Sequence, residues 1–87
     1  MSLVLLGTDA CHLCDDAQKI LLSLDGQLPC DVFLDDIASS ETLVERYGLR
    51  IPVLLFEPGG QELDWPFDRQ DVLTFVHQVM NTSESAE

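Results

Sequence analysis

Two cysteines separated by two residues are the part of this 87-residue chain whose types and spacing can do chemistry. The segment reads Cys11-His12-Leu13-Cys14. A thiolate is the nucleophile in thiol–disulfide exchange, and a second thiol one helical turn away can resolve the mixed disulfide that the first one forms. The pair therefore points to dithiol redox chemistry, with two cysteines at a chance spacing as the alternative.

The elements around the pair would place it at the start of a helix. Leu3 to Leu6 is an apolar run that predicts a buried strand, and Gly7 to Ala10 a loop. From Cys11 onward, apolar residues at positions 13, 17, 20, 21 and 24 predict an amphipathic helix. Cys11 would then lie at a helix N-terminus, where unpaired backbone N–H groups and the helix dipole favour a thiolate.

The rest of the chain predicts three further strands, at residues 31–35, 51–56 and 61–63, and two further helices. One helix should be capped by Ser39 or Ser40 and end at Gly48, and the last should be capped by Asp68 with Asp71 as its capping-box partner. The order β-α-β-α-β-β-α predicts an α/β fold with a four-stranded mixed sheet and helices on both faces. We expect a single domain over residues 1–80 and a polar C-terminal tail over 81–87.

The composition excludes several classes of function. Sixteen acidic residues against four basic ones give a net charge of −12, which repels nucleic acid and anionic membranes and favours a basic partner. No segment approaches the roughly 18 apolar residues of a membrane span, and the N-terminal apolar run is too short for a signal peptide. Three cysteines do not make a disulfide-stapled secreted scaffold. The sequence therefore predicts a cytoplasmic protein with no nucleic-acid or membrane partner.

A metal site is not predicted. A structural zinc site takes four ligands, and besides the cysteine pair the chain offers only Cys30, His12 and His77, with no second pair at ligand spacing. We expect Cys30 to be a small buried hydrophobic residue, with a regulatory or dimer-linking thiol as the alternative. Trp65 is expected to cover the core, or, if exposed near Cys11, to take part in recognition.

The chain resembles the glutaredoxin-like proteins of the thioredoxin-fold superfamily. The resemblance covers the element order from Ser2 to about Met80 and two motifs, Cys11-His12-Leu13-Cys14 after the first strand and Ile51-Pro52-Val53 at the start of the third. It implies that Pro52 follows a cis peptide bond and faces the cysteines, and that the backbone of Ile51 pairs with bound substrate. It further implies that Cys11 is the attacking thiol and Cys14 the resolving thiol.

The chain departs from familiar dithiol glutaredoxins in three places. They carry Pro-Tyr between the cysteines, a lysine shortly before them, and a Gly-Gly pair that grips glutathione at the start of the last helix. Here the corresponding segments are His12-Leu13, Thr8-Asp9-Ala10 and residues 63–68. Arg50, and less favourably Lys19, are the basic residues left to hold the glutathione carboxylates. We therefore expect no bound cofactor, and the reductant is either glutathione or a protein thiol.

The charges near the cysteines bear on their reactivity. Asp9, Asp15 and Asp16 disfavour a second anion nearby, so we expect a reducing or weakly active centre. A protonated His12 would act in the opposite direction, unless it simply faces solvent. His12 joins Ile51, Pro52 and Arg50 in the expected substrate-binding set.

Two functions follow from these observations. The first is a small thiol–disulfide oxidoreductase that acts on protein or small-molecule disulfides through Cys11 and Cys14. The alternative is a thioredoxin-fold binding or redox-sensing module that docks a basic protein partner and does not turn over substrate.

Overall fold

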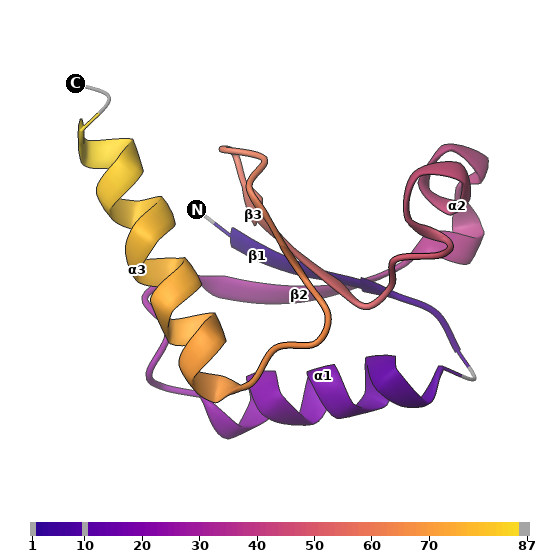
Figure 1. The fold of residues 1–87 in the computed structure, drawn as a ribbon, viewed down its shortest axis with the longest axis horizontal. Helices are drawn as coiled ribbons and strands as arrows, with labels where there is room; N and C mark the ends of the chain where they lie inside the picture. The colour runs from indigo at the N-terminus through magenta and orange to yellow at the C-terminus, as the bar shows by residue number, and fades with distance from the viewer. Residues whose placement is uncertain (1, 10, 86–87) are drawn as a thin grey trace.

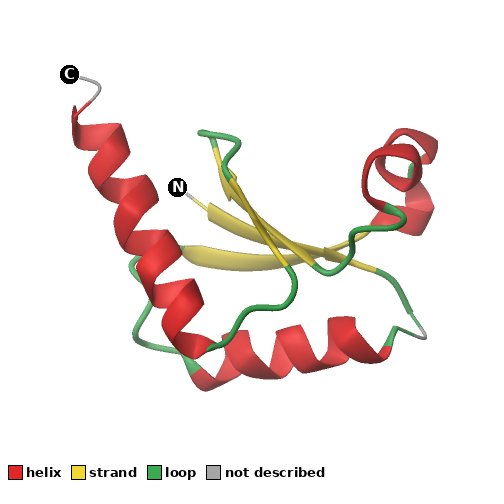
Figure 2. Cartoon of the chain, in the orientation of Figure 1, coloured by secondary structure: helices red, strands yellow, loops and turns green. Residues whose placement is uncertain are grey.

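The computed structural model describes residues 2–9 and 11–85, with side chains as far as Met80. Its four strands are β1 (Ser2–Gly7), β2 (Asp31–Asp36), β3 (Val53–Glu57) and β4 (Glu62–Asp64), in the spatial order β2-β1-β3-β4. β1 pairs in parallel with β2 and antiparallel with β3, and β3 pairs antiparallel with β4. The predicted mixed four-stranded sheet is therefore confirmed (Figure 2).

Helices lie on both faces of this sheet, as predicted. The long helices α1 (His12–Ser23) and α3 (Arg69–Ser85) lie on one side, and α2 (Glu41–Tyr47) lies on the other (Figure 1). A single 3₁₀ turn, η1 (Ile37–Ser39), joins β2 to α2. None of the helices within residues 2–9 and 11–85 combines the length and apolar character of a membrane span.

The caps that start the helices agree with the sequence. Ser40 caps α2, since its hydroxyl accepts a hydrogen bond from the backbone N–H of Leu43 at 3.3 Å. Asp68 and Asp71 form the expected capping box: the Asp71 N–H donates to the Asp68 carboxylate at 2.8 Å, and the Asp68 N–H donates to the Asp71 carboxylate at 3.0 Å.

Several boundaries differ from the prediction. α3 continues to Ser85, so most of the segment predicted as a polar tail is helical, while Ala86 and Glu87 lie outside the described residues, as does Ala10 of the predicted loop. β3 begins at Val53 because Pro52 has no N–H to donate to a ladder, and β4 lies one residue later than expected.

The core has two parts, one on each face of the sheet. Leu3, Leu5, Leu54 and Phe56 pack against the apolar stripes of α1 and α3. On the other face, Val4, Leu6 and Val53 pack with Ile37 and Tyr47, the latter from the end of α2. The central strands β1 and β3 thus supply the buried surface on both sides.

β2 departs from the expectation that helices cover all the strands. All six of its residues are exposed, including the apolar Val32, Phe33 and Leu34, and none of them belongs to either part of the core. The reason is its place at the edge of the sheet, because α1 packs against β1 and α3 rather than beneath β2. β2 is therefore held mainly by its hydrogen bonds to β1.

This difference predicts unequal effects of the same truncation in two strands. Leu54→Ala in β3 removes a fully buried side chain and should lower the free energy of unfolding by about 2–5 kcal/mol. Leu34→Ala in β2, where the side chain is 57% exposed, should change it by less than about 0.5 kcal/mol. Urea unfolding of the oxidised protein measures both, and equal losses would contradict the burial described above.

Candidate functional site

Cys11 and Cys14 lie at the N-terminus of α1 and form a disulfide, with their Cα atoms 5.2 Å apart. Cys11 is the N-cap residue: its Sγ accepts a hydrogen bond from the backbone N–H of Cys14 at 3.2 Å. Cys14 lies in the first turn and is only 6% exposed, whereas Cys11 is half-buried. The two cysteines therefore differ in exposure, and the more exposed one occupies the position where the helix favours negative charge.

Gly7, the last residue of β1, leaves room for Cys14. A Cβ atom at this position would lie 3.0 Å from the Cys14 Sγ and 3.1 Å from its Cβ, closer than almost all side-chain contacts. A larger residue at position 7 would therefore push α1 or the disulfide away from the sheet. The sequence around Gly7 predicts only the start of a loop, because nothing local to this residue indicates a close approach from a later helix.

An acidic pocket of about 260 Å³ lies beside Cys14. Asp9 and Asp15, two of the three aspartates that the sequence pointed to, line it together with Gln18. Asp35 and Asp36 from the end of β2 also line it, and sequence analysis missed them. Their position beside Cys14 is predictable, because the C-terminal ends of parallel strands lie at the same end of a sheet and β2 is parallel to β1.

The predicted substrate platform lies at the same end of the sheet. The Ile51–Pro52 peptide bond is cis, as the resemblance implies, and Pro52 is fully buried. Val53 pairs with Leu6, so the antiparallel register carried one residue further places Pro52 alongside Gly7. The chain thus brings Pro52 to the strand end that also holds Cys14.

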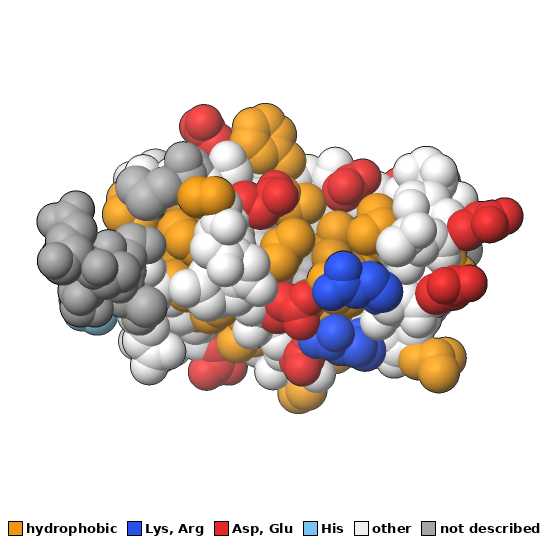
Figure 3. Space-filling model, turned by 90° about the horizontal axis from the view of Figure 1, so that it is seen from above, with side chains coloured by type: hydrophobic (Ala, Val, Ile, Leu, Met, Phe, Trp, Pro, Cys, Tyr) orange, Lys and Arg blue, Asp and Glu red, His pale blue; other side chains and the backbone are white. Residues whose placement is uncertain are grey.

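A polar network fixes the segment that leads into Pro52. The buried Tyr47 donates its hydroxyl to Glu62, and Arg50 binds Glu62 at 2.7 Å and Asp64 at 2.6 Å. The guanidinium groups of Arg46 and Arg50 both lie over the Tyr47 ring. Figure 3 shows blue Lys and Arg side chains gathered next to red acidic ones on this face. The network ties the end of α2 to β4 across the residues that precede Pro52.

The network also shifts the acidity of its members. The hydrogen bond from Tyr47, together with that from Arg50, lowers the pKa of Glu62. The same bond to Glu62, with burial, raises the pKa of Tyr47. The two carboxylates raise the pKa of Arg50, which stays charged at any accessible pH. Arg50 is therefore engaged within the protein, and its role toward substrate stays a prediction.

The remaining candidates are spread over the molecule. His12 is exposed between the two cysteines. Cys30 is half-buried rather than fully buried, and desolvation raises the pKa of its thiol. Trp65 is half-buried against the core, with its ring 5.0 Å from that of Phe67 in an edge-on arrangement, as expected for a residue that covers the core. Within the described part of the chain, no group of three or more His, Cys, Asp or Glu residues is placed to hold a metal ion.

The sheet is mixed, has the strand order β2-β1-β3-β4 and is flanked by helices. The helix that follows β1 begins with a Cys-x-x-Cys pair. Together these features define the thioredoxin-like fold. The model of the family described as Glutaredoxin-like domain (DUF836) matches residues 2–77, and the chain belongs to this family.

Solved structures agree with this assignment. The X-ray structure of protein XcR50 from X. campestris is similar with 38% identity and a TM-score of 0.76, over 87% of this chain and 96% of that chain. The solution structure of protein Ne2328 from Nitrosomonas europaea is similar with 26% identity and a TM-score of 0.72, over 86% of this chain and 89% of that one. Comparison with the curated proteins found no match.

The Tyr47–Glu62 hydrogen bond predicts a pH-dependent contribution to stability. Because the pKa of Glu62 is lowered in the folded state, its carboxylate stabilises the fold above the unfolded pKa of about 4.3, and this contribution disappears as the pH falls through the folded pKa. Tyr47→Phe should therefore lower the free energy of unfolding by about 1 kcal/mol at neutral pH and by less in acid. Urea unfolding over a series of pH values measures it, and a loss that grows in acid would contradict the assignment.

Proposed function

We propose that this protein is a thiol–disulfide oxidoreductase in which Cys11 and Cys14 are the reacting residues. The observation that carries the proposal is the unequal exposure of the two cysteines at the start of α1, where Cys11 is partly exposed and Cys14 is buried. Thiol–disulfide exchange calls for this difference, because the substrate must reach one sulfur while the other waits to resolve the intermediate.

The exchange begins from the dithiol form. The Cys11 thiolate attacks one sulfur of a substrate disulfide, which breaks that S–S bond, forms a mixed disulfide with Cys11 and releases the first substrate thiol. Cys14 then loses its proton and attacks the Cys11 sulfur, so the second substrate thiol leaves and the Cys11–Cys14 disulfide remains. The substrate gains two electrons and two protons, and a thiol reductant restores the dithiol.

The backbone at α1 contributes directly to this chemistry. Cys11 is the N-cap, at the end of α1 where the first N–H groups lack partners within the helix, and the Cys14 N–H donates to its sulfur in the disulfide form. The same donors stabilise negative charge on Cys11 when it becomes a thiolate or a leaving group. In the proposal, Ile51 and Pro52 form the platform on which substrate backbone lies, and His12 and Arg50 border it.

The acidic pocket sets the direction of the reaction. Asp9, Asp15, Asp35 and Asp36 disfavour a thiolate beside them, so the dithiol should be a reductant rather than an oxidant.

We propose a cytoplasmic setting, where thiol reductants keep such pairs reduced. No bound cofactor is part of the mechanism, and the electrons come from glutathione or a protein thiol.

Three cysteine variants test the assignment of roles. Cys11→Ser should reduce a model disulfide no faster than buffer does, with either glutathione or thioredoxin and its reductase supplied. Cys14→Ser should accumulate a mixed disulfide on Cys11, detectable by mass spectrometry, because the resolving thiol is gone. Cys30→Ser is the matched control and should react like the wild type. If the wild type is as inert as Cys11→Ser with both reductants, the non-catalytic binding module replaces this proposal.

The influence of the pocket has its own test. In the reduced protein, Asp35→Asn combined with Asp36→Asn should accelerate alkylation of the cysteine pair by iodoacetamide about two- to fivefold at fixed pH, since two nearby negative charges are removed. Iodoacetamide is uncharged, so steering of the reagent does not contribute. Glu41→Gln combined with Glu45→Gln, at exposed positions of α2, removes the same two charges and serves as a control for the change in net charge. An unchanged or slower rate would show that the aspartates do not restrain the thiols.

A further inference from the structure

The most exposed apolar feature beside the candidate site is the edge strand β2. Val32 is 38% exposed, Phe33 53% and Leu34 57%, in three consecutive positions. The opposite edge of the sheet is different, because β4 has only three residues and two of them, Glu62 and Asp64, are acidic. Proteins usually shorten, charge or cover their edge strands, and β2 is six residues long with an apolar centre.

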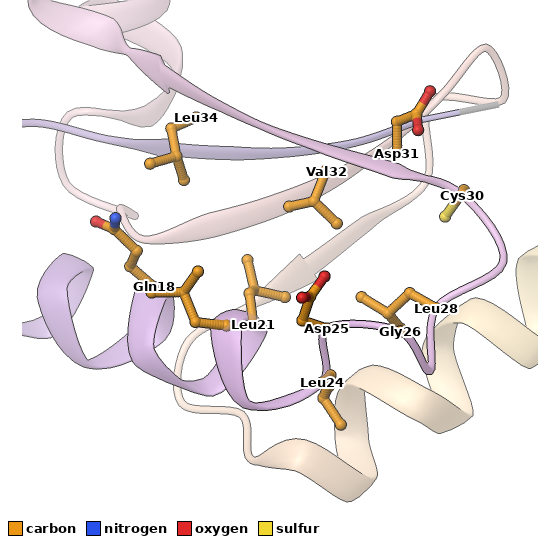
Figure 4. Close-up of a pocket in the computed structure, with 11 residues that line it drawn as sticks. Gln18, Leu21, Leu24, Asp25, Gly26, Leu28, Cys30, Asp31, Val32 and Leu34 are labelled. Carbon is orange, nitrogen blue, oxygen red and sulfur yellow. The ribbon is translucent and has the colours of Figure 1, made fainter.

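A groove of about 360 Å³ runs between β2 and α1. Val32 and Leu34 point from β2 toward α1, where Gln18 and Leu21 lie, and Asp31 points the other way (Figure 4). Leu22, on α1, also lines the groove and is itself exposed. The groove shares Gln18 and Leu34 with the acidic pocket beside Cys14, so it leads to the disulfide.

The side chains on the two faces of β2 differ in polarity, and this difference defines which partner strand would fit beside it. Side chains alternate along a strand, so Val32 and Leu34 face the groove, while the Asp31 side chain points away although the residue also borders the groove. Asp35 and Asp36 follow at the end of the strand and line the acidic pocket into which the groove leads. A strand added to this edge would place apolar side chains against the groove and basic side chains against the aspartates. No Lys or Arg is among the described residues that line the groove or the acidic pocket.

A second copy of this chain does not fit the edge. If two β2 strands paired antiparallel with their apolar centres aligned, Phe33 opposite Phe33, then Asp31 would lie opposite Asp35, or opposite Asp36 when the register shifts by one residue. Each pairing occurs twice by symmetry, and like charges directly opposite are unfavourable. The net charge of −12 on each chain adds repulsion. The charges therefore favour a basic partner over self-association.

We propose that β2 and the α1–β2 groove dock an extended segment of a partner protein in which apolar and basic residues alternate. The segment adds to the sheet as a fifth strand, so that backbone hydrogen bonds provide affinity and the alternation provides specificity. Its end reaches the acidic pocket next to Cys14. This docking goes beyond the redox step and stands whether or not the cysteines turn over.

The test uses the oxidised full-length protein and three synthetic peptides of equal length. One alternates lysine and valine, one alternates glutamate and valine, and one has the composition of the first with its lysines and valines in separate blocks. The alternating lysine peptide should shift the backbone amide resonances of residues 31–36 and slow their hydrogen exchange. The other two should bind at least about tenfold more weakly, since they lack the facing charge pairs or the strand pattern.

Two variants locate the surface. Leu34→Lys should abolish binding of the alternating lysine peptide, while Val44→Lys, at another exposed apolar position, on α2, should leave it unchanged. The proposal would be overturned if the block peptide bound equally well or if the alternating lysine peptide did not bind. It would also be overturned if the amide resonances that shift lay outside β2 and the groove, or if the protein dimerised through β2 as its concentration rose. Because the disulfide stays closed throughout, these outcomes are independent of whether Cys11 reduces small disulfides.

Discussion

The structure depends on the pairing of β1 with both of its neighbours. β1 is parallel to β2 and antiparallel to β3. Its C-terminal end therefore lies beside the C-terminal end of β2 and the start of β3, at one end of the strands. α1 begins shortly after that end, and Gly7 allows Cys14 to approach β1 closely. The disulfide, the acidic pocket and Pro52 are thus brought together by strand register, although they come from three separate parts of the chain.

The same arrangement leaves one part of the molecule uncovered. β1 and β3 have helices on both faces and supply the core, whereas β2 lies outside it and contributes hydrogen bonds to β1. The polar network of Tyr47, Arg50 and Glu62 holds the opposite side, where it ties α2 to β4 next to Pro52. One side of the site is therefore linked by hydrogen bonds and ion pairs, and the other is an exposed edge strand with no further strand beside it among the described residues.

The sequence predicted the parts that depend on local patterning. The cysteine spacing at a helix start, the caps at Ser40 and Asp68 and the order of the elements are all visible in short segments. What it could not provide depends on contacts between distant segments: the fit of Gly7 against Cys14, the pairing of Arg50 with β4, and the exposure of β2. The placement of Asp35 and Asp36 beside Cys14 does follow from the sequence, because they end a strand parallel to β1.

The measurement that tests this account most directly is the reduction potential of the Cys11–Cys14 pair, found by equilibrating the protein with thiol–disulfide buffers. Because the pair lies at a helix N-terminus beside several aspartates, we predict that the two cysteines form one two-electron redox couple. Its reduction potential should lie nearer to the value of about −270 mV of thioredoxin than to the roughly −120 mV of strong oxidants. A potential at the oxidising end, or cysteines that titrate independently with no shared couple, would contradict it.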